Sequence, residues 1–182
     1  MKTKDFFKVM FTRIRPGEVF AYFIKEKNKY GLIQVLGKSR SYGHVTGYNI
    51  RVFYNLVDSL DKKTINSTVN SKEFYYIQSF FKPDLVCNSD DRLERFDIPD
   101  FVIIPKYTRA CERKPNGKLY WFVLEEMKCI KTYPKYEEEL SSLSPSMAWG
   151  IQIIKLCWIE GFTLENWNQL EDKWYDEWLN AM

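Results

Sequence analysis

Two runs of β-branched and aromatic residues lie close together near the N-terminus, at 18–24 and 30–36. Pro16-Gly17 precedes the first run, Gly37 follows the second, and the polar segment Lys25–Lys29 separates them. Paired strands joined by a short turn have this pattern in sequence. The residues therefore predict a β-hairpin at the start of the folded domain.

The next segments show further strand patterns. Residues 49–56 alternate between an apolar face and a mostly polar face, which predicts a strand of the same sheet. The polar stretch 58–71 is expected to be a loop, and the aromatic-rich stretch 73–81 a further strand. These patterns extend the predicted hairpin into a larger sheet.

Two more strands are predicted beyond residue 100. The apolar run Phe101–Ile104 lies between Pro99 and Pro105, and we expect it to form a short buried strand. The sequence Lys114–Gly117 has the composition of a tight turn, after which residues 119–127 return as a strand. The spacing shows no alternation of strands with helices, so the strands are expected to be mainly antiparallel.

The C-terminal part has a helical pattern instead. Ser144-Pro145 is typical of a helix N-terminus, and the residues from 147 to 159 are apolar nearly all round. Gly161 is expected to end this helix, and Thr163 to cap a second helix from 164 to about 180.

Together these patterns predict a single α+β domain spanning residues 1–182. Residues 1–136 would form a twisted, partly closed, mainly antiparallel sheet of five to seven strands. Two helices within 144–181 would pack against that sheet. A length of 182 residues agrees with one domain.

Composition adds limits to this picture. The chain is 45% hydrophobic and 17% aromatic, which is too apolar for disorder. Its longest apolar stretch, around 151–159, contains Gln152 and Lys155 and is far shorter than a membrane span. The charged first residues do not resemble a secretory signal, so we expect a cytoplasmic protein with no membrane partner.

No motif for a metal, a cofactor or a catalytic nucleophile is present. The single histidine, His44, and the widely spaced cysteines lack the pairing of a zinc site. We expect the cysteines to be reduced and buried. Those cysteines are Cys87, Cys111, Cys129 and Cys157. The sequence predicts no cofactor and no enzyme.

Charge is distributed unevenly along the chain. Residues 1–136 carry +10, and the residues from Glu137 onward carry −7. On the predicted second helix Glu165, Asp172 and Asp176 share one flank beside an apolar stripe. This flank is either a solvated helix face or a surface that binds a basic partner.

The basic part supports an alternative interpretation as a small nucleic-acid-binding module. Lys38, Arg40 and Arg51 interleave with Tyr42, Tyr48 and Tyr54. A small barrel with cationic and aromatic residues can hold single-stranded nucleic acid, with Arg40, Tyr42 and Arg51 as the contacts here. Excess lysine that only solubilises an aromatic-rich domain explains the same pattern, and we expect nucleic acid to be the less favoured partner.

The N-terminal hairpin resembles the immunity protein 26 family of bacterial polymorphic toxin systems. The similarity lies in Gly17–Ala21 and in Tyr30–Leu36, with a further similar step at Gly161-Phe162. Membership would imply a non-enzymatic inhibitor that binds a cognate toxin and blocks it by occlusion. Because many such toxins are basic nucleases, the resemblance favours the acidic flank, Glu165, Asp172 and Asp176, as the partner-binding surface. Reversing these three charges should then slow association.

Overall fold

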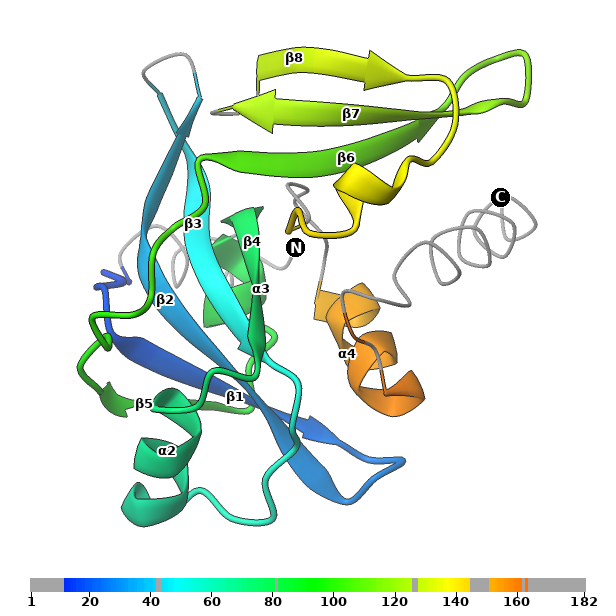
Figure 1. The fold of residues 1–182 in the computed structure, drawn as a ribbon. Coiled ribbons are helices and arrows are strands. Elements are labelled where there is room, and N and C mark those ends of the chain that lie inside the picture. Colours follow the sequence, from blue (N-terminus) through cyan, green and yellow to red (C-terminus); the bar gives the residue numbers. More distant parts are fainter. Residues whose placement is uncertain are drawn as a thin grey trace.

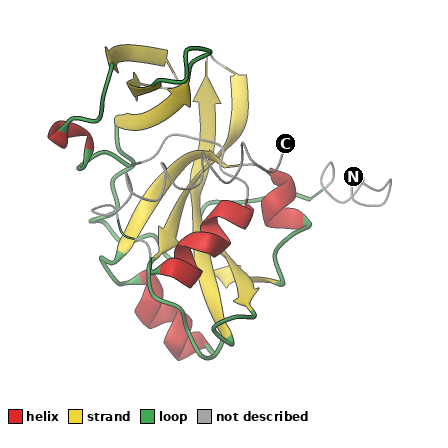
Figure 2. Cartoon of the chain, turned by 90° about the vertical axis from the view of Figure 1, so that its right-hand side faces the viewer, coloured by secondary structure: helices red, strands yellow, loops and turns green. Residues whose placement is uncertain are grey.

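The computed structural model describes residues 12–41, 44–80, 82–125, 128–144, 151–161 and 163. Within these ranges the chain has the predicted α+β fold with antiparallel sheets. The strands form two sheets, one of five strands and one of three, and neither is a closed barrel. The three-stranded sheet lies beyond one end of the five-stranded sheet (Figures 1 and 2).

The larger sheet has the strand order β4-β3-β2-β1-β5, and every neighbouring pair is antiparallel. Its strands are β1 (Glu18–Ile24), β2 (Lys29–Ser41), β3 (His44–Phe53), β4 (Phe74–Phe80) and β5 (Asp91–Arg95). β1 and β2 form the predicted hairpin. Asn28 closes its turn with a positive φ of 53°, a conformation that asparagine tolerates better than most residues. The strand predicted at 73–81 is confirmed as β4, and the strand predicted at 49–56 corresponds to β3, which begins earlier, at His44, and ends at Phe53.

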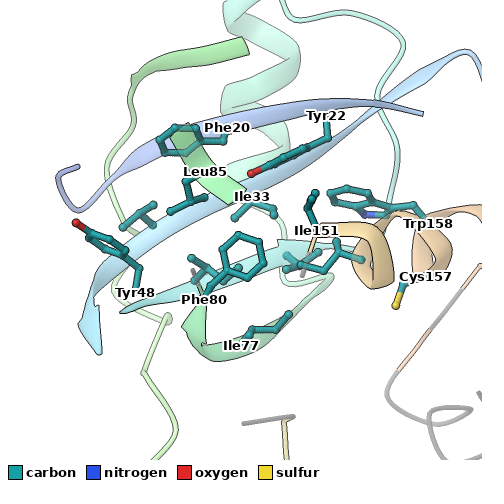
Figure 3. Close-up of a cluster of buried hydrophobic side chains, with 14 of the residues drawn as sticks. Phe20, Tyr22, Ile33, Tyr48, Ile77, Phe80, Leu85, Ile151, Cys157 and Trp158 are labelled. Carbon is teal, nitrogen blue, oxygen red and sulfur yellow. The ribbon is translucent and has the colours of Figure 1, made fainter. Parts of the chain in front are cut away.

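One face of this sheet packs against α3 (Lys82–Val86) and α4 (Ile151–Glu160). Trp158 of α4 lies flat against the sheet at Gly31, where a Cβ atom would come within 2.5 Å of Trp158 Cδ2. The indole Nε1–H donates to the Phe53 carbonyl oxygen at 2.7 Å. Figure 3 shows Trp158 beside Tyr22 in this apolar cluster. The absence of a side chain at Gly31 therefore lets α4 dock on the sheet.

The opposite face packs against α2 (Lys62–Val69), which lies within the stretch predicted to be a loop. That prediction was wrong. Asp61 caps the helix by accepting from the Thr64 backbone N–H at 2.9 Å, and Ile65 and Val69 face the core one turn apart. The serine, threonine and asparagine residues of the segment have low helix propensity, so burial of these two apolar residues decides the conformation.

The smaller sheet has the order β6-β7-β8. Its strands are β6 (Tyr107–Arg113), β7 (Leu119–Glu125) and β8 (Lys128–Tyr133). The predicted turn joins β6 to β7, and Gly117 adopts the positive φ of 76° that the turn needs. A short 3₁₀ helix, η1 (Glu138–Leu140), covers one face, where Trp121, Val123, Tyr133 and Leu140 form a small cluster.

Of two further predictions, the buried strand at 101–104 is wrong and the first C-terminal helix is confirmed. Phe101–Ile104 is not a buried strand, since it forms an exposed connection between β5 and β6. The prolines on both sides limit it to four residues and remove the backbone donors at its borders. The first C-terminal helix is confirmed as α4 and ends at Gly161, which has a φ of 72°. The predicted second helix, 164–180, lies outside the described residues.

Candidate functional site

Of the residues proposed for partner binding, Glu165, Asp172 and Asp176 lie outside the described part of the chain. Among those proposed for nucleic acid, Tyr42 also lies outside it, and Arg40 pairs with Val45 in the β2–β3 ladder. The acidic flank therefore stays a prediction.

Arg51 has a different role from the one the alternating pattern suggested. Its side chain is completely buried between the larger sheet and α2. Its Nε and Nη2 donate to Gln34 Oε1 at 2.8 and 2.5 Å, and Nη2 also donates to the Val69 carbonyl oxygen at 2.6 Å. The prediction of a surface contact failed because the helix that covers this face was taken for a loop. Arg51 holds α2 on the sheet and is not placed to contact a phosphate backbone.

Arg51 is charged, although no carboxylate of the described residues accepts a hydrogen bond from its guanidinium group. Its guanidinium carbon lies 4.8 Å from the Phe53 ring centre and 5.0 Å from that of Phe74, and both rings present cation–π contacts. Burial lowers the pKa of Arg51 to about 10, which still leaves the group protonated at neutral pH. Gln34 completes the network by donating to the carbonyl oxygens of Gly17 and Phe96.

Gly17, the first residue of the family-like stretch, is fixed in place by this network. Its φ is 88°, and a Cβ there would meet the Phe96 carbonyl oxygen at 2.6 Å. The next residue, Glu18, is buried, and Arg92 of β5 donates to both of its carboxylate oxygens at 2.8 Å. The Gly-Glu pair therefore stabilises the contact of β1 with β5 and is not a surface feature.

A surface of a different kind forms between the two sheets. We define the apolar ledge as Phe101, Ile103, Ile104 and Tyr107, the large hydrophobic residues exposed in and beside the β5–β6 connection. Their exposed fractions are 39%, 74%, 43% and 39%. Sequence reasoning missed this surface, although Pro99 and Pro105 already indicated that the run could not continue a strand ladder.

The ledge is held by aromatic contacts on its inner side. The Phe101 ring stacks on Phe74 with a centroid distance of 6.4 Å and an interplanar angle of 28°. Lys72 Nζ lies 5.6 Å from the same ring. The Tyr76 hydroxyl is hydrogen-bonded to the backbone of Ile103. These contacts fix the Phe101 ring and the Ile103 backbone on the face of the sheet that α2 also covers.

An open cleft of about 640 Å³ lies beside the middle of β2, where Val35, Gly37 and Lys38 line it. We call it the cationic cleft, because its lining includes four basic residues and no acidic one among the described residues. They are Arg13, Arg15, Lys38 and Lys82. Tyr48 also lines it, and Lys38 and Tyr48 were both noted in the basic and aromatic pattern of the sequence. Arg13, Arg15 and Lys82 were missed because they come from separate segments.

Other chemistry is limited in the described part of the chain. No group of three histidine, cysteine, aspartate or glutamate residues is placed there to hold a metal ion. The four cysteines form no disulfide, as predicted, but the prediction that they are buried holds only for Cys157, since Cys87 and Cys111 are half-buried and Cys129 is exposed. No described helix is long and apolar enough to cross a membrane.

Comparison with protein-family models, with curated proteins and with solved structures finds no match to the chain. The two surfaces, the apolar ledge and the cationic cleft, are therefore interpreted from their own geometry.

Proposed function

We propose that this protein is an immunity protein, a non-enzymatic inhibitor that binds a cognate bacterial toxin in the cytoplasm and blocks it by occlusion. The observation that carries the proposal is the apolar ledge, which exposes four large hydrophobic side chains on one short segment. Protein interfaces owe most of their affinity to a few such side chains at their centre.

The surroundings of the ledge favour a protein partner. Asp100 and Lys106 are exposed beside it and provide charge of both signs. An apolar centre with a polar rim is the usual composition of a protein–protein interface. The stacking of Phe101 on Phe74 reduces the conformational freedom that binding would otherwise have to remove.

The β1–β2 hairpin supports a toxin as the protein that binds the apolar ledge. The stretch Gly17–Ala21 resembles the immunity protein 26 family, and its glycine and glutamate have defined structural roles that explain why both residue types are needed there. The acidic flank, Glu165, Asp172 and Asp176, would add attraction to a basic toxin and raise the association rate.

A co-expression experiment tests this function. A photo-crosslinking residue at Ile103 should capture one protein from the source cells, and a crosslinker at Lys118, in the β6–β7 turn, should not. The captured protein, expressed alone in a host cell, is expected to stop growth. Co-expression with the present chain should restore growth.

The same assay assigns the surface. Ile103→Asp is expected to abolish rescue because it places a charge at the centre of the apolar contact. Lys118→Asp changes an exposed residue away from the ledge and should rescue like the native protein. A captured protein that is harmless when expressed alone would contradict the toxin assignment, and full rescue by Ile103→Asp would contradict the ledge.

A further inference from the structure

The cationic cleft is built from segments that are distant in sequence. Arg13 and Arg15 come from the chain before β1, Lys38 from β2 and Lys82 from α3. None of these four forms an ion pair with another described residue, whereas Lys29, Lys62 and Lys131 on other parts of the surface each contact a carboxylate. Positive charge is therefore concentrated here, and no carboxylate of the described residues is paired with it.

Glu18, an acid close enough to the cleft to act on its residue Tyr48, is already paired. Glu18 acts on Tyr48, whose pKa is raised by burial and by this carboxylate. Both Glu18 oxygens accept from Arg92, and the Glu18 side chain is only 8% exposed. Glu18 is thus unable to serve as the counterion for the cleft.

Two arginines of β5 hold the backbone of the segment that carries Arg13 and Arg15. Arg92 Nη2 donates to the Arg13 carbonyl oxygen at 2.6 Å, and Arg95 Nε donates to the Pro16 carbonyl oxygen at 3.0 Å. The backbone of Arg15 is held as well, since its carbonyl oxygen accepts from the Glu18 N–H at 3.3 Å. The basic side chains therefore extend from an anchored backbone.

Tyr48 adds a neutral donor to the lining. Its ring is buried beside Phe80, and Figure 3 shows its hydroxyl directed away from the apolar cluster. The Tyr48 hydroxyl is protonated at neutral pH, as in any tyrosine, and burial raises its pKa further, so the O–H can donate to an anion.

From this geometry we propose that the cationic cleft binds a ligand carrying two or more phosphate groups. Four cations that form no ion pair with a described residue match a multiply charged anion, and the planar guanidinium groups of Arg13 and Arg15 suit the paired oxygens of a phosphate. A volume of about 640 Å³ is within the usual range for small-molecule sites. Binding of a phosphate ligand at the cationic cleft is separate from toxin binding at the apolar ledge, because the two surfaces share no residue.

Calorimetric titration of the full chain at low salt tests the proposal. The probes are ATP without magnesium, inorganic pyrophosphate, orthophosphate and a short oligothymidylate. ATP and pyrophosphate are expected to bind more tightly than orthophosphate, and their affinity should fall as salt is raised. Two phosphate sources fit the site, and both outcomes support it: tighter binding of ATP identifies a free nucleotide, and tighter binding of the oligomer identifies a nucleic-acid strand.

Matched charge reversals locate the site. Lys38→Glu with Lys82→Glu should weaken ATP binding by at least about tenfold. Lys25→Glu with Lys27→Glu makes the same change in net charge at the exposed β1–β2 turn and should leave the affinity within about twofold, because these lysines lie outside the cleft. The proposal is overturned if none of the multiply charged probes binds the native protein. It is equally overturned if the two double variants lose the same affinity.

Discussion

Each of the two sheets has a buried arginine, Arg51 or Arg109, that reaches the end of a short helix. Arg51 of β3 donates to the carbonyl oxygen of Val69, the last residue of α2. Arg109 of β6 donates to the carbonyl oxygen of Leu140, the last residue of η1, at 2.7 Å. The final carbonyls of a helix have no partner within the helix and carry partial negative charge. Each sheet therefore provides a buried cation that donates to the last carbonyl of the helix covering it, and in η1 that oxygen also accepts from the Leu143 N–H at 3.1 Å.

The sheets differ in how much they bury. The five-stranded sheet has apolar clusters on both faces, against α3 and α4 on one side and α2 on the other. In the three-stranded sheet the described cluster lies on the η1 side, and all of β8 except Tyr133 is exposed. Since apolar burial is the main favourable contribution to folding, the larger sheet should dominate the stability of the chain.

The largest effect is expected at the contact between α4 and the larger sheet. Trp158→Ala should lower the free energy of unfolding by about 3–5 kcal/mol, because it removes a buried indole and the hydrogen bond to Phe53. Gly31→Ala should also destabilise, since the new Cβ would overlap the indole ring. Urea denaturation measures both. In the Trp158→Ala background the Gly31→Ala change should have little further effect, and full additivity would contradict the close packing.

The second-largest loss of stability is expected for Arg51, which donates to the carbonyl oxygen at the end of α2. Arg51→Met keeps much of the side-chain volume but leaves Gln34 Oε1 and the Val69 carbonyl oxygen without these donors. A loss of about 3 kcal/mol is expected from two buried acceptors. Urea denaturation provides the measurement, and Lys63→Met, at an exposed position of α2, serves as the control. Equal stability of the two variants would show that Arg51 does not hold α2.

A smaller and more local effect is expected for Arg109. Its Nη1 donates to the Tyr136 hydroxyl and the Leu140 carbonyl oxygen at 2.9 and 2.7 Å. Arg109→Met should destabilise the smaller sheet by about 2 kcal/mol, with amide exchange accelerated in β6–β8 and unchanged in β1–β3. Faster exchange throughout the chain would mean that the two sheets unfold as one unit.

The smallest effect concerns pH. Lys131 and Tyr133 of β8 bind the Glu139 carboxylate of η1, and their hydrogen bonds hold the pKa of Glu139 below its usual range. A lowered folded-state pKa stabilises above the unfolded pKa, and this stabilisation is lost as pH falls through the folded-state value. Amide protection in β8 should therefore decrease on acidification through the carboxylate range. Glu139→Gln should lack that part of the pH dependence, and an identical profile in both proteins would exclude Glu139 as its origin.

Much of the larger sheet was predictable from sequence because its signals are local. Glycine, proline and the alternation of β-branched residues marked the β1–β2 hairpin, β3 and β4, and Gly161 marked the end of α4. The prediction of one sheet did not anticipate the division into two. Pairing between distant strands such as β1 and β5 depends on contacts that no local pattern records.

The functional surfaces were harder to predict because they depend on what covers each strand. Arg51 lies in the alternating pattern at a position typical of an exposed residue, but α2 covers that face of the sheet. Phe101–Ile104 was apolar enough for a buried strand, yet it remains at the surface between two prolines. The cationic cleft joins Arg13, Lys38 and Lys82 from three segments, so no contiguous motif reveals it.

The central structural claim is that the five-stranded sheet forms the stable core and the three-stranded sheet a separate, weaker unit. Native-state hydrogen exchange tests it directly. Amides of buried residues such as Ile33 in β2 should exchange only through global unfolding, while Val123 in β7 should exchange through a smaller opening of lower free energy and lower urea dependence. The same free energy and urea dependence at both positions would contradict the claim.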